Sequence, residues 1–314
     1  MRQGLCFQTL LACVALSFSA AQAQTAVKEL APLPDGPAGA VWYERQVLVP
    51  QAQADSLSIW DQRQLNRLMD LNQCQPSALL PLQGNLLLAC AQSPRLLVIN
   101  PMGQVLESWP RPREESGLVR GGDNKAPDLS GATAMVKDSR GGVYIAVTGA
   151  AQADSSAARQ GKIYYLSASR TLLTSVASLL DYPSGLAISP DGKQLYVSEG
   201  LSRQVKRFDI NQTRLENPAV FMRLADIHTP AANAAEAPRP GALAFNTRGH
   251  LYVALQGEGQ ILVTSAEGRK LAALPVPLPY VKGFSFSRSD RVLYIAAARS
   301  AEPGAAGALY EMRL

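Results

Sequence analysis

Short apolar runs alternate with turn signals along most of this chain. In the stretch PSGLAISPDGKQLYVSEGLSRQVKRFDI, from Pro183 to Ile210, an apolar run (LAI) precedes the turn signal SPDGK, and two further strand-like runs (LYVS and VKRFDI) follow. Pro190 restricts φ, Asp191 can bond to its own backbone, and Gly192 tolerates a positive φ, so this triplet favours a tight reversal. The pattern predicts a three-stranded β-meander, a unit that is only marginally stable by itself.

The same apolar-turn-apolar pattern occurs six times. Equivalent positions of successive copies lie roughly 40 to 57 residues apart, and a period of about this size is typical of propeller blades. A third strand-like run follows in every copy, and a fourth follows in the first five. The six copies begin at Gly39, Ser77, Thr133, Gly185, Ala242 and Gly283.

The sixth copy lacks a fourth strand because the sequence ends at Leu314. The segment AVKEL, which starts at Ala26, has the pattern of a strand and can supply the missing one. Closing the ring in this way removes the open sheet edge that a linear array would expose. We therefore predict an all-β fold, a six-bladed β-propeller with four strands per blade, closed by an N-terminal strand that completes the last blade. The alternative, a β-sandwich, does not require six copies in the same phase.

Residues 1–23 have the pattern of a secretory signal peptide, because Arg2 precedes an apolar centre and the segment ends in a small-x-small cleavage site (AQA). Two alternatives are a transmembrane anchor, for which the apolar centre is short, and a lipoprotein signal that ends at Cys13. We expect one propeller domain, residues 24–314. We also expect it to be periplasmic or secreted, with no integral membrane segment once the signal is removed.

Charge and cysteine content limit the kinds of function. The formal net charge of +5, or about +4 without Arg2, is scattered along the chain and does not predict nucleic-acid binding. Outside the signal, Cys74 and Cys90 remain as a pair that can form a disulfide in an oxidising compartment. The two histidines, His228 and His250, give little support to a histidine-rich zinc site or a conventional Ser-His-Asp triad.

The fourth and fifth copies resemble the SMP-30/gluconolactonase/LRE-like family of six-bladed propellers. The segments that carry the resemblance are YPSGLAISPDGKQLYVSEG and RPGALAFNTRGHLYVALQGEGQILV, and the likeness is tightest between Gly131 and Leu251. The resemblance implies a lactonase-type hydrolase with a divalent cation, usually Ca²⁺, on the propeller axis. In that family the cation is held by a glutamate before the first inner strand, the asparagine of a P-N-G triplet and the aspartate of a P-D-G triplet. Such oxygen donors suit Ca²⁺.

This chain departs from the family at each of those positions. The P-N-G triplet reads P-S-G here, with the hydroxyl of Ser184 in place of the amide, and the P-D-G triplet reads P-G-A, with Gly241 in place of the aspartate. An S-P-N-D motif near the substrate reads G-A-T-A, with Thr133 at the asparagine. The glutamate corresponds to Asp35 or, in an alternative alignment, to Ala38. Because one carboxylate rarely holds Ca²⁺ against water, we expect the usual metal site to be largely lost, with Asp35 as its weak remainder.

Other side chains can line the mouth of the propeller axis. Lys282 and Arg239 lie just before the sixth and the fifth inner strands, and two cations there could bind a carboxylate or a phosphate. Glu199 follows the second strand of the fourth blade and could pair with these cations or act as a base. Each of these three residues could instead be an ordinary surface charge. His228 lies in a long loop and is a further candidate for acid–base chemistry.

Two functions remain open at this point. The first is an exported propeller, similar to SMP-30/gluconolactonase proteins, that binds a small molecule or a protein partner at its axial mouth without the usual metal. The second is a hydrolase of lactones or related esters whose site is rebuilt around Asp35, Thr133, Ser184, Glu199, His228 and the nearby cations Arg239 and Lys282. Neither hypothesis assigns a definite catalytic residue, and Ca²⁺ is implied only by the resemblance.

Overall fold

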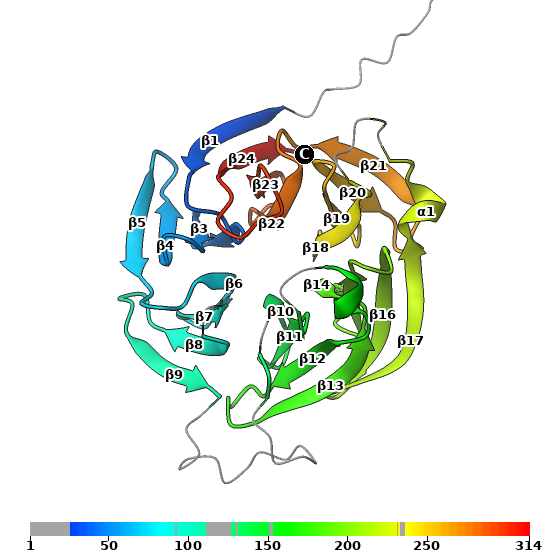
Figure 1. The fold of residues 1–314 in the computed structure, drawn as a ribbon, viewed down its shortest axis with the longest axis horizontal. Helices are drawn as coiled ribbons and strands as arrows, with labels where there is room; N and C mark the ends of the chain where they lie inside the picture. The colour runs from blue at the N-terminus through cyan, green and yellow to red at the C-terminus, as the bar shows by residue number, and fades with distance from the viewer. Residues whose placement is uncertain are drawn as a thin grey trace, which may run out of the picture.

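The computed structural model describes residues 26–91, 93–110, 127–129, 131–150, 153–230, 232 and 236–314. These residues form six four-stranded sheets arranged as blades around a central axis (Figure 1). Six blades of four strands confirm the all-β propeller that the sequence repeat predicts. The predicted signal peptide falls on residues 1–23, which lie outside the described residues.

Each blade is an antiparallel sheet, and in blades 1 to 5 its four strands follow one another along the chain from the axis outward. Blade 1 consists of β2 (Val41–Tyr43), β3 (Gln46–Gln51), β4 (Ser56–Trp60) and β5 (Leu65–Asp70). Blade 2 consists of β6 (Pro76–Leu82), β7 (Asn85–Cys90), β8 (Arg95–Ile99) and β9 (Val105–Trp109). Blade 3 consists of β10 (Ala132–Lys137), β11 (Val143–Val147), β12 (Gly161–Leu166) and β13 (Leu173–Leu180).

The other three blades repeat this order. Blade 4 consists of β14 (Pro183–Ile188), β15 (Gln194–Glu199), β16 (Gln204–Asn211) and β17 (Arg214–Arg223). Blade 5 consists of β18 (Arg239–Phe245), β19 (Leu251–Gln256), β20 (Gln260–Thr264) and β21 (Lys270–Pro275). Blade 6 consists of β22 (Tyr280–Phe286), β23 (Val292–Ala298), β24 (Gly307–Arg313) and β1 (Val27–Leu33). The helix α1 (Leu224–Ile227) follows β17, and within the described residues we find no helix with the length and apolar character of a membrane span.

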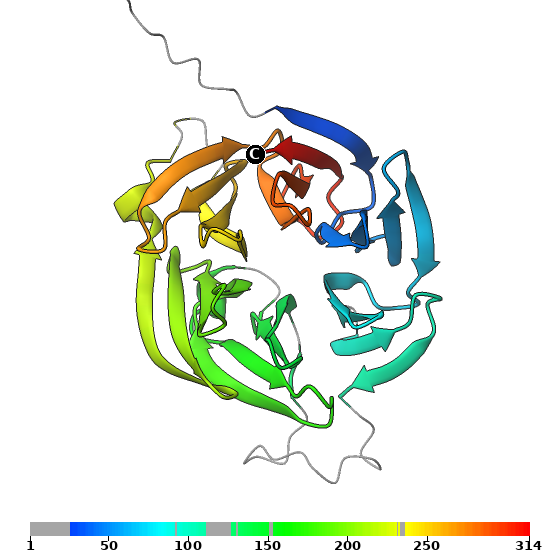
Figure 2. The ribbon, with the colours of Figure 1, turned by 180° about the vertical axis from the view of Figure 1, so that it is seen from behind.

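Blade 6 takes its strands from both ends of the described chain (Figure 2). Its outer strand β1 pairs antiparallel with β24, so that Val27 lies opposite Met312 and Leu33 lies opposite Gly307. Because β1 leads directly into blade 1, this pairing ties the first blade to the last. The outer edge of β24 is thereby covered by a strand of the same chain.

The second strand of each blade is apolar on both faces because the neighbouring blades cover it from both sides. In blade 3 all five residues of β11 are buried, and turns bound this short apolar run. The outer strand β21 instead has alternate residues exposed, as expected for a sheet face in water. The two patterns distinguish inner from outer strands within each sequence copy.

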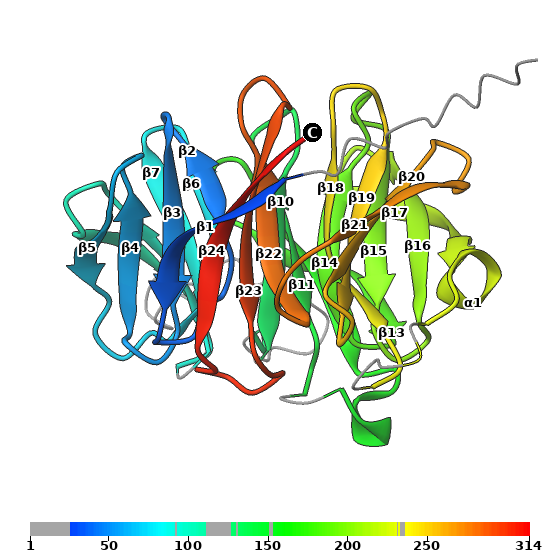
Figure 3. The same cartoon turned by 90° about the horizontal axis from the view of Figure 1, so that it is seen from above.

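Turn chemistry fixes the hairpins between the first and second strands, and Figure 3 shows the loops gathered at the two ends of the propeller. In blade 4 Asp191 Oδ1 accepts hydrogen bonds from Ser189 Oγ (2.6 Å) and from the backbone N–H of Lys193 (3.1 Å). Gly192 has a φ of +73°, which favours glycine. The reversal predicted at this triplet is therefore confirmed.

Aromatic pairs hold neighbouring blades together. Tyr196 in blade 4 contacts Phe245 in blade 5, with ring centroids 4.9 Å apart, and Tyr252 contacts Phe286 in blade 6 at 4.8 Å. The series continues across the closure of the ring, where Tyr294 of blade 6 stacks on Trp42 of blade 1 at 5.2 Å. Such pairs contribute about 0.5–1.5 kcal/mol beyond their burial, so the interface that closes the ring has the same kind of contact as the interfaces of blade 5 with blades 4 and 6.

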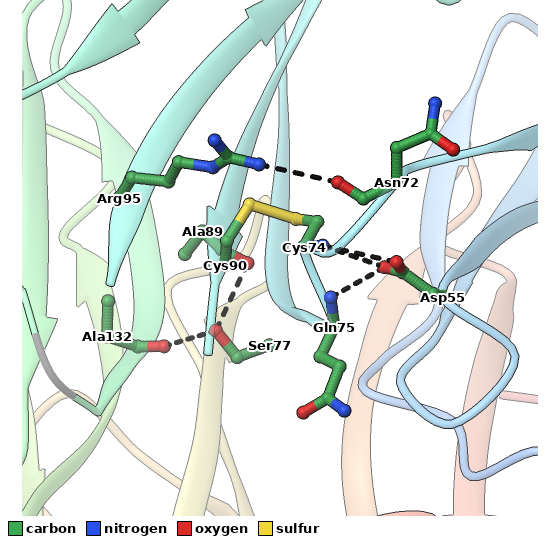
Figure 4. Close-up of a disulfide and its surroundings, with 9 residues drawn as sticks. All are labelled: Asp55, Asn72, Cys74, Gln75, Ser77, Ala89, Cys90, Arg95 and Ala132. Atoms are coloured by element: carbon green, nitrogen blue, oxygen red, sulfur yellow. Dashed lines mark hydrogen bonds between the residues drawn. A yellow bond between two sulfur atoms is a disulfide. The ribbon is translucent and has the colours of Figure 1, made fainter. Parts of the chain in front are cut away.

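A disulfide joins the start of blade 2 to its second strand (Figure 4). Cys74, which precedes β6, is bonded to Cys90, the last residue of β7. The two come together because β6 and β7 are antiparallel and Pro76 lies opposite Cys90. The Asp55 carboxylate accepts hydrogen bonds from the backbone N–H groups of Cys74 (3.0 Å) and Gln75 (2.6 Å), so this segment is also tied to blade 1.

Replacing both cysteines by serine is expected to lower the free energy of unfolding by about 2–3 kcal/mol, because the disulfide closes a loop in the unfolded chain. Urea unfolding at pH 7, with and without a reductant, measures this change. The reductant should bring the wild-type protein to the stability of the Cys74→Ser, Cys90→Ser variant and leave the variant unaffected. Equal stability of the oxidised wild type and the variant would contradict the prediction.

Candidate functional site: the axial mouth

Five of the six inner strands begin with the same irregularity. In each, the inner strand has one residue more than the second strand between two paired positions, which is a β-bulge. Bulges at the rim of a sheet redirect a side chain. We call the residues at these bulges the bulge ring; its members are Ser77, Thr133, Ser184, Gly241 and Lys282. We call the end of the propeller where the bulge ring lies the axial mouth.

The hydroxyl groups of the bulge ring bond successive inner strands to one another. Ser77 Oγ donates to the carbonyl oxygen of Ala132 at 2.6 Å, and Thr133 Oγ1 donates to that of Pro183 at 3.1 Å. Ser184 Oγ donates in the same way to the carbonyl oxygen of Pro240 at 3.0 Å. Each acceptor is the residue just before the next bulge, so one hydrogen bond is repeated from blade 2 to blade 5.

In blade 5 a side chain from the second strand takes over this role. Gly241 has no side chain, and a Cβ at this position would lie 2.6 Å from Nε2 of Gln256, the last residue of β19. The Gln256 amide donates a hydrogen bond to the carbonyl oxygen of Val281, which precedes the bulge at Lys282. The amide therefore occupies the space that a ligand side chain would need at Gly241.

Lys282 is the only charged member of the bulge ring. It is half-buried, and its Nζ donates to the carbonyl oxygen of Ala301 at 2.9 Å and lies 5.8 Å from the centre of the Tyr280 ring. Among the described residues no carboxylate forms an ion pair with it. Burial lowers the pKa of Lys282 to about 8, an effect that the negative charge of Glu302 partly offsets.

Replacing Lys282 by methionine is expected to raise the free energy of unfolding at pH 7 by about 1–2 kcal/mol, because burial disfavours the protonated amine. With a pKa of about 8 in the folded state against the usual 10.5, the penalty is complete below pH 8 and disappears as the pH rises towards 10.5. The advantage of Lys282→Met should therefore shrink at pH 10. Urea unfolding at pH 7 and pH 10 measures the difference, and Lys193→Met, at an exposed lysine, is the control. A variant no more stable than wild type at pH 7 would contradict the expectation.

Arg239 does not provide a second unpaired cation. Its guanidinium bonds to the Glu236 carboxylate at 2.9 Å and to the carbonyl oxygen of Ala153 at 3.1 Å. Glu236 also accepts a hydrogen bond from the Tyr280 hydroxyl at 2.8 Å. Of the two predicted cations, Arg239 is therefore neutralised by an ion pair, and Lys282 is not.

Glu199, the last residue of β15, lies opposite Pro183 at the mouth end of blade 4, but its side chain is buried in the blade. Its side chain is fully buried, and its carboxylate bonds to Lys206 Nζ at 3.0 Å and to Gln204 Nε2 at 2.8 Å. The backbone N–H of Asp181 donates to the same carboxylate at 3.0 Å. These three partners hold the group as a structural ion pair, so the predicted pairing with Arg239 and Lys282 is not formed.

His228 and Asp35 lie in different surroundings. His228 follows α1, on the outer side of the blades, and its Nε2 contacts Glu258 Oε2 at 2.6 Å. Both side chains are almost fully buried, so His228 does not open into the axial mouth. Asp35 lies half-buried between β1 and β2, and within the described residues its carboxylate makes neither a hydrogen bond nor an ion pair.

The residues at the family's ligand positions do not fit a Ca²⁺ ion. Ser184 offers one neutral hydroxyl oxygen, Gly241 offers no side chain, and Asp35 is left as a single carboxylate. In the part of the chain that the structure describes, no three His, Cys, Asp or Glu side chains are grouped so that they could hold a metal. Ca²⁺ usually takes six to eight oxygen ligands.

Two functional residues were missed by reasoning from sequence. Ser77 begins the second copy as Thr133 begins the third, so comparison of the copies could have found it. Gln256 has no such signal, because its role depends on the missing side chain of Gly241. A hollow of about 500 Å³ lies between blades 3 and 4, and its lining residues include Tyr165, Leu172, Val176 and Leu215.

Comparison with known proteins agrees with this fold. The sequence model of the SMP-30/Gluconolactonase/LRE-like region matches residues 33–299. The chain therefore belongs to the SMP-30/gluconolactonase/LRE-like family, as the fourth and fifth copies indicate. A curated protein of Rhizobium meliloti (strain 1021) named "Putative sugar lactone lactonase" is 27% identical over 164 residues. That match covers 48% of this chain and 52% of the relative, so it spans about half of the length of each.

Several solved structures share the propeller. A luciferin-regenerating enzyme has a TM-score of 0.71 at 16% identity and covers 92% of this chain and 95% of its own. A gluconolactonase from Xanthomonas campestris has a TM-score of 0.69 at 17% identity, with coverages of 92% and 89%. Regucalcin from Agrobacterium tumefaciens strain C58, described as a calcium-binding protein, has a TM-score of 0.66 at 16% identity, with coverages of 91% and 95%. At such identities the likeness shows the fold alone.

Proposed function

We propose that this propeller binds a small oxygen-bearing molecule, a carboxylate or a carbonyl compound, in its axial mouth, and that Lys282 contacts the ligand oxygen. The observation that carries this proposal is the setting of Lys282, a half-buried charge with no ion-pair partner among the described residues. An ammonium group that has lost part of its hydration gains from an anionic or carbonyl oxygen.

The remaining members of the bulge ring support this assignment. Ser77, Thr133 and Ser184 each donate their hydroxyl hydrogen to the next blade, so only their lone pairs are left for a ligand. The three hydroxyl oxygens can therefore accept hydrogen bonds from a ligand, while Lys282 can donate hydrogen bonds to it. A ligand with hydroxyl groups and one carbonyl or carboxylate group would complement this pattern.

We further propose that this binding does not use the family's divalent cation. The groups at the family's ligand positions are one neutral hydroxyl, a glycine and one carboxylate, and Gln256 fills the space beside Gly241. A calorimetric titration with CaCl₂ is expected to show no saturable binding below about 1 mM. Stoichiometric binding at micromolar Ca²⁺, lost in Asp35→Ala or Ser184→Ala, would overturn this part of the proposal.

The ligand proposal is tested by thermal unfolding with gluconate and with glucono-δ-lactone as probes. Either probe at millimolar concentration should raise the melting temperature of the wild type. The shift should disappear in Lys282→Gln and persist in Lys193→Gln, which removes a matched exposed lysine. A shift that survives in Lys282→Gln would show that the ligand binds elsewhere and would refute the role of Lys282.

A hydrolase of lactones or esters is the second candidate function, and the family together with the printed name of the Rhizobium relative favours it. Asp35 is the sequence-predicted group whose carboxylate remains uncommitted among the described residues, whereas Glu199 and His228 are buried in pairs. Measuring the hydrolysis rates of a panel of lactones with the wild type and with Asp35→Asn would distinguish the hydrolase from a binding protein. Turnover that is lost in Asp35→Asn would favour the hydrolase over simple binding.

We also propose that the protein works in the periplasm or outside the cell. The Cys74–Cys90 disulfide supports this location, because such bonds persist mainly in oxidising compartments. The signal-peptide pattern of residues 1–23 also supports export from the cytoplasm. Mass spectrometry of the mature protein should find an N-terminus at Gln24, and an intact N-terminus on a cytoplasmic protein would refute the location.

A further inference from the structure

The amine of Lys282 keeps donors that the protein does not use. A lysine ammonium group has three N–H donors. Among the described residues Nζ has one hydrogen-bond acceptor, the carbonyl oxygen of Ala301 at 2.9 Å, and the Tyr280 ring lies at 5.8 Å. The other donors are left for solvent or for a ligand in the axial mouth.

The charges around Lys282 do not hold its proton strongly. The acidic group that acts on it is Glu302, through space and without an ion pair, while Glu236 is engaged by Arg239 and Tyr280. Burial lowers the pKa of Lys282 to about 8, so about a quarter of the amine is neutral at pH 7.5. A neutral amine in a partly desolvated site is a nucleophile towards carbonyl groups.

We propose that Lys282 forms an imine with the aldehyde or ketone group of a small hydroxylated molecule bound in the axial mouth. The nitrogen attacks the carbonyl carbon and gives a carbinolamine. Loss of water, made of the carbonyl oxygen and the two hydrogens of the amine, then leaves a C=N bond, and no oxidant or reductant is needed. The inference rests on the proposed ligand-binding role of the mouth and names the chemical class of its ligand.

The bulge ring favours a hydroxylated carbonyl compound over a plain one. The hydroxyl oxygens of Ser77, Thr133 and Ser184 are all half-buried, and their hydrogens are engaged with the next blade. They can accept hydrogen bonds from hydroxyl groups of the ligand while its carbonyl carbon meets Lys282. A small hydroxyaldehyde therefore serves as the probe.

Reductive trapping tests this proposal on the full mature chain. Glyceraldehyde and sodium cyanoborohydride at pH 7.5 convert an imine into a stable secondary amine, and peptide mass spectrometry gives the rate of labelling at each lysine. Lys282 should be labelled about tenfold faster than the exposed residues Lys193 and Lys270, because more of its amine is neutral. Propionaldehyde, which lacks hydroxyl groups, should show a smaller preference for Lys282.

The control variant is Lys282→Arg, which keeps the positive charge but cannot form an imine. It should carry no adduct at this position and should label at Lys193 and Lys270 as the wild type does. Labelling of Lys282 no faster than these two lysines would overturn the inference. If the gluconate shift persists while Lys282 shows no preferential labelling, only the imine is wrong. If Lys282 is labelled rapidly but neither gluconate nor the lactone stabilises the protein, the imine stands and the proposed binding of these ligands fails.

Discussion

Glu199→Gln is expected to lower the free energy of unfolding by about 3 kcal/mol, since it removes one member of a buried ion pair. The Glu199 side chain is 0% exposed and that of Lys206 is 25% exposed, so the lysine would be left largely buried without its counter-charge. The hydrogen bonds from Gln204 and from the backbone of Asp181 would also be weakened. Urea unfolding at pH 7 measures the loss.

Two further variants show whether the effect comes from the pair. Lys206→Met should be destabilised to a similar extent, and the double variant should lose less than the sum of the two single variants. Glu267→Gln breaks an exposed pair with Arg269 and should leave the stability nearly unchanged, because water screens this pair. A Glu199→Gln protein that keeps its stability but loses ligand binding would contradict the structural role and indicate that Glu199 takes part in ligand binding.

Gly185→Ala is expected to destabilise the protein by about 3 kcal/mol or more, because the inner strands of blades 4 and 5 are in direct contact at this position. A methyl group at Gly185 would overlap the carbonyl oxygen of Gly241 and lie 2.8 Å from Ser198 Oγ. Ser198 Oγ itself donates to that carbonyl at 2.7 Å, so neither group can move without losing a buried hydrogen bond. Backbone atoms cannot rotate aside as a flexible side chain can, so the overlap would force the two strands apart.

Gly39→Ala is the matched control for this prediction. Gly39 lies before the inner strand of blade 1, and a Cβ there would meet no atom within 4 Å. Its substitution should change the free energy of unfolding by less than about 0.5 kcal/mol. If Gly185→Ala unfolds at the same urea concentration as Gly39→Ala, the inner strands of blades 4 and 5 are not as close as the structure shows.

The bulge ring explains how the propeller keeps its inner strands together at positions where the family resemblance implies metal ligands. Ser77, Thr133 and Ser184 each bond one inner strand to the next, and Gln256 of β19 bonds to β22, so hydrogen bonds between protein groups link blades 2 to 6. Hydrogen bonds of this kind contribute about 1 kcal/mol each. Lys282, which ends the series, is the member whose charge these bonds do not satisfy.

The positions of the candidate residues were predictable, but their partners were not. Comparison of the copies places Thr133 at the start of the third copy, and Ser184 and Lys282 just before the fourth and sixth copies, and the structure brings all three to the bulge ring. Glu199 was predicted at the same end of blade 4, yet its side chain turns into the blade towards Lys206. Adjacent residues of a strand point to opposite faces, and which face meets a partner depends on the neighbouring strands.

The sequence by itself determined the six blades, the reversal at Pro190-Asp191-Gly192 and the family. These features follow from strand periodicity, turn chemistry and motifs, all of which act over a few residues. It also limited the disulfide to Cys74 and Cys90, and the antiparallel pairing of β6 with β7 brings the two together.

Only the tertiary structure decided what the polar residues of the mouth do. The acceptors of Ser77, Thr133 and Ser184 lie 55, 50 and 56 residues further along the chain, one blade away. Such a bond depends on how two blades pack, which no local pattern specifies. The same packing engages the hydroxyl hydrogens of the bulge ring and places Arg239 and Glu199 in ion pairs. Lys282 remains as a half-buried amine without an ion pair among the described residues.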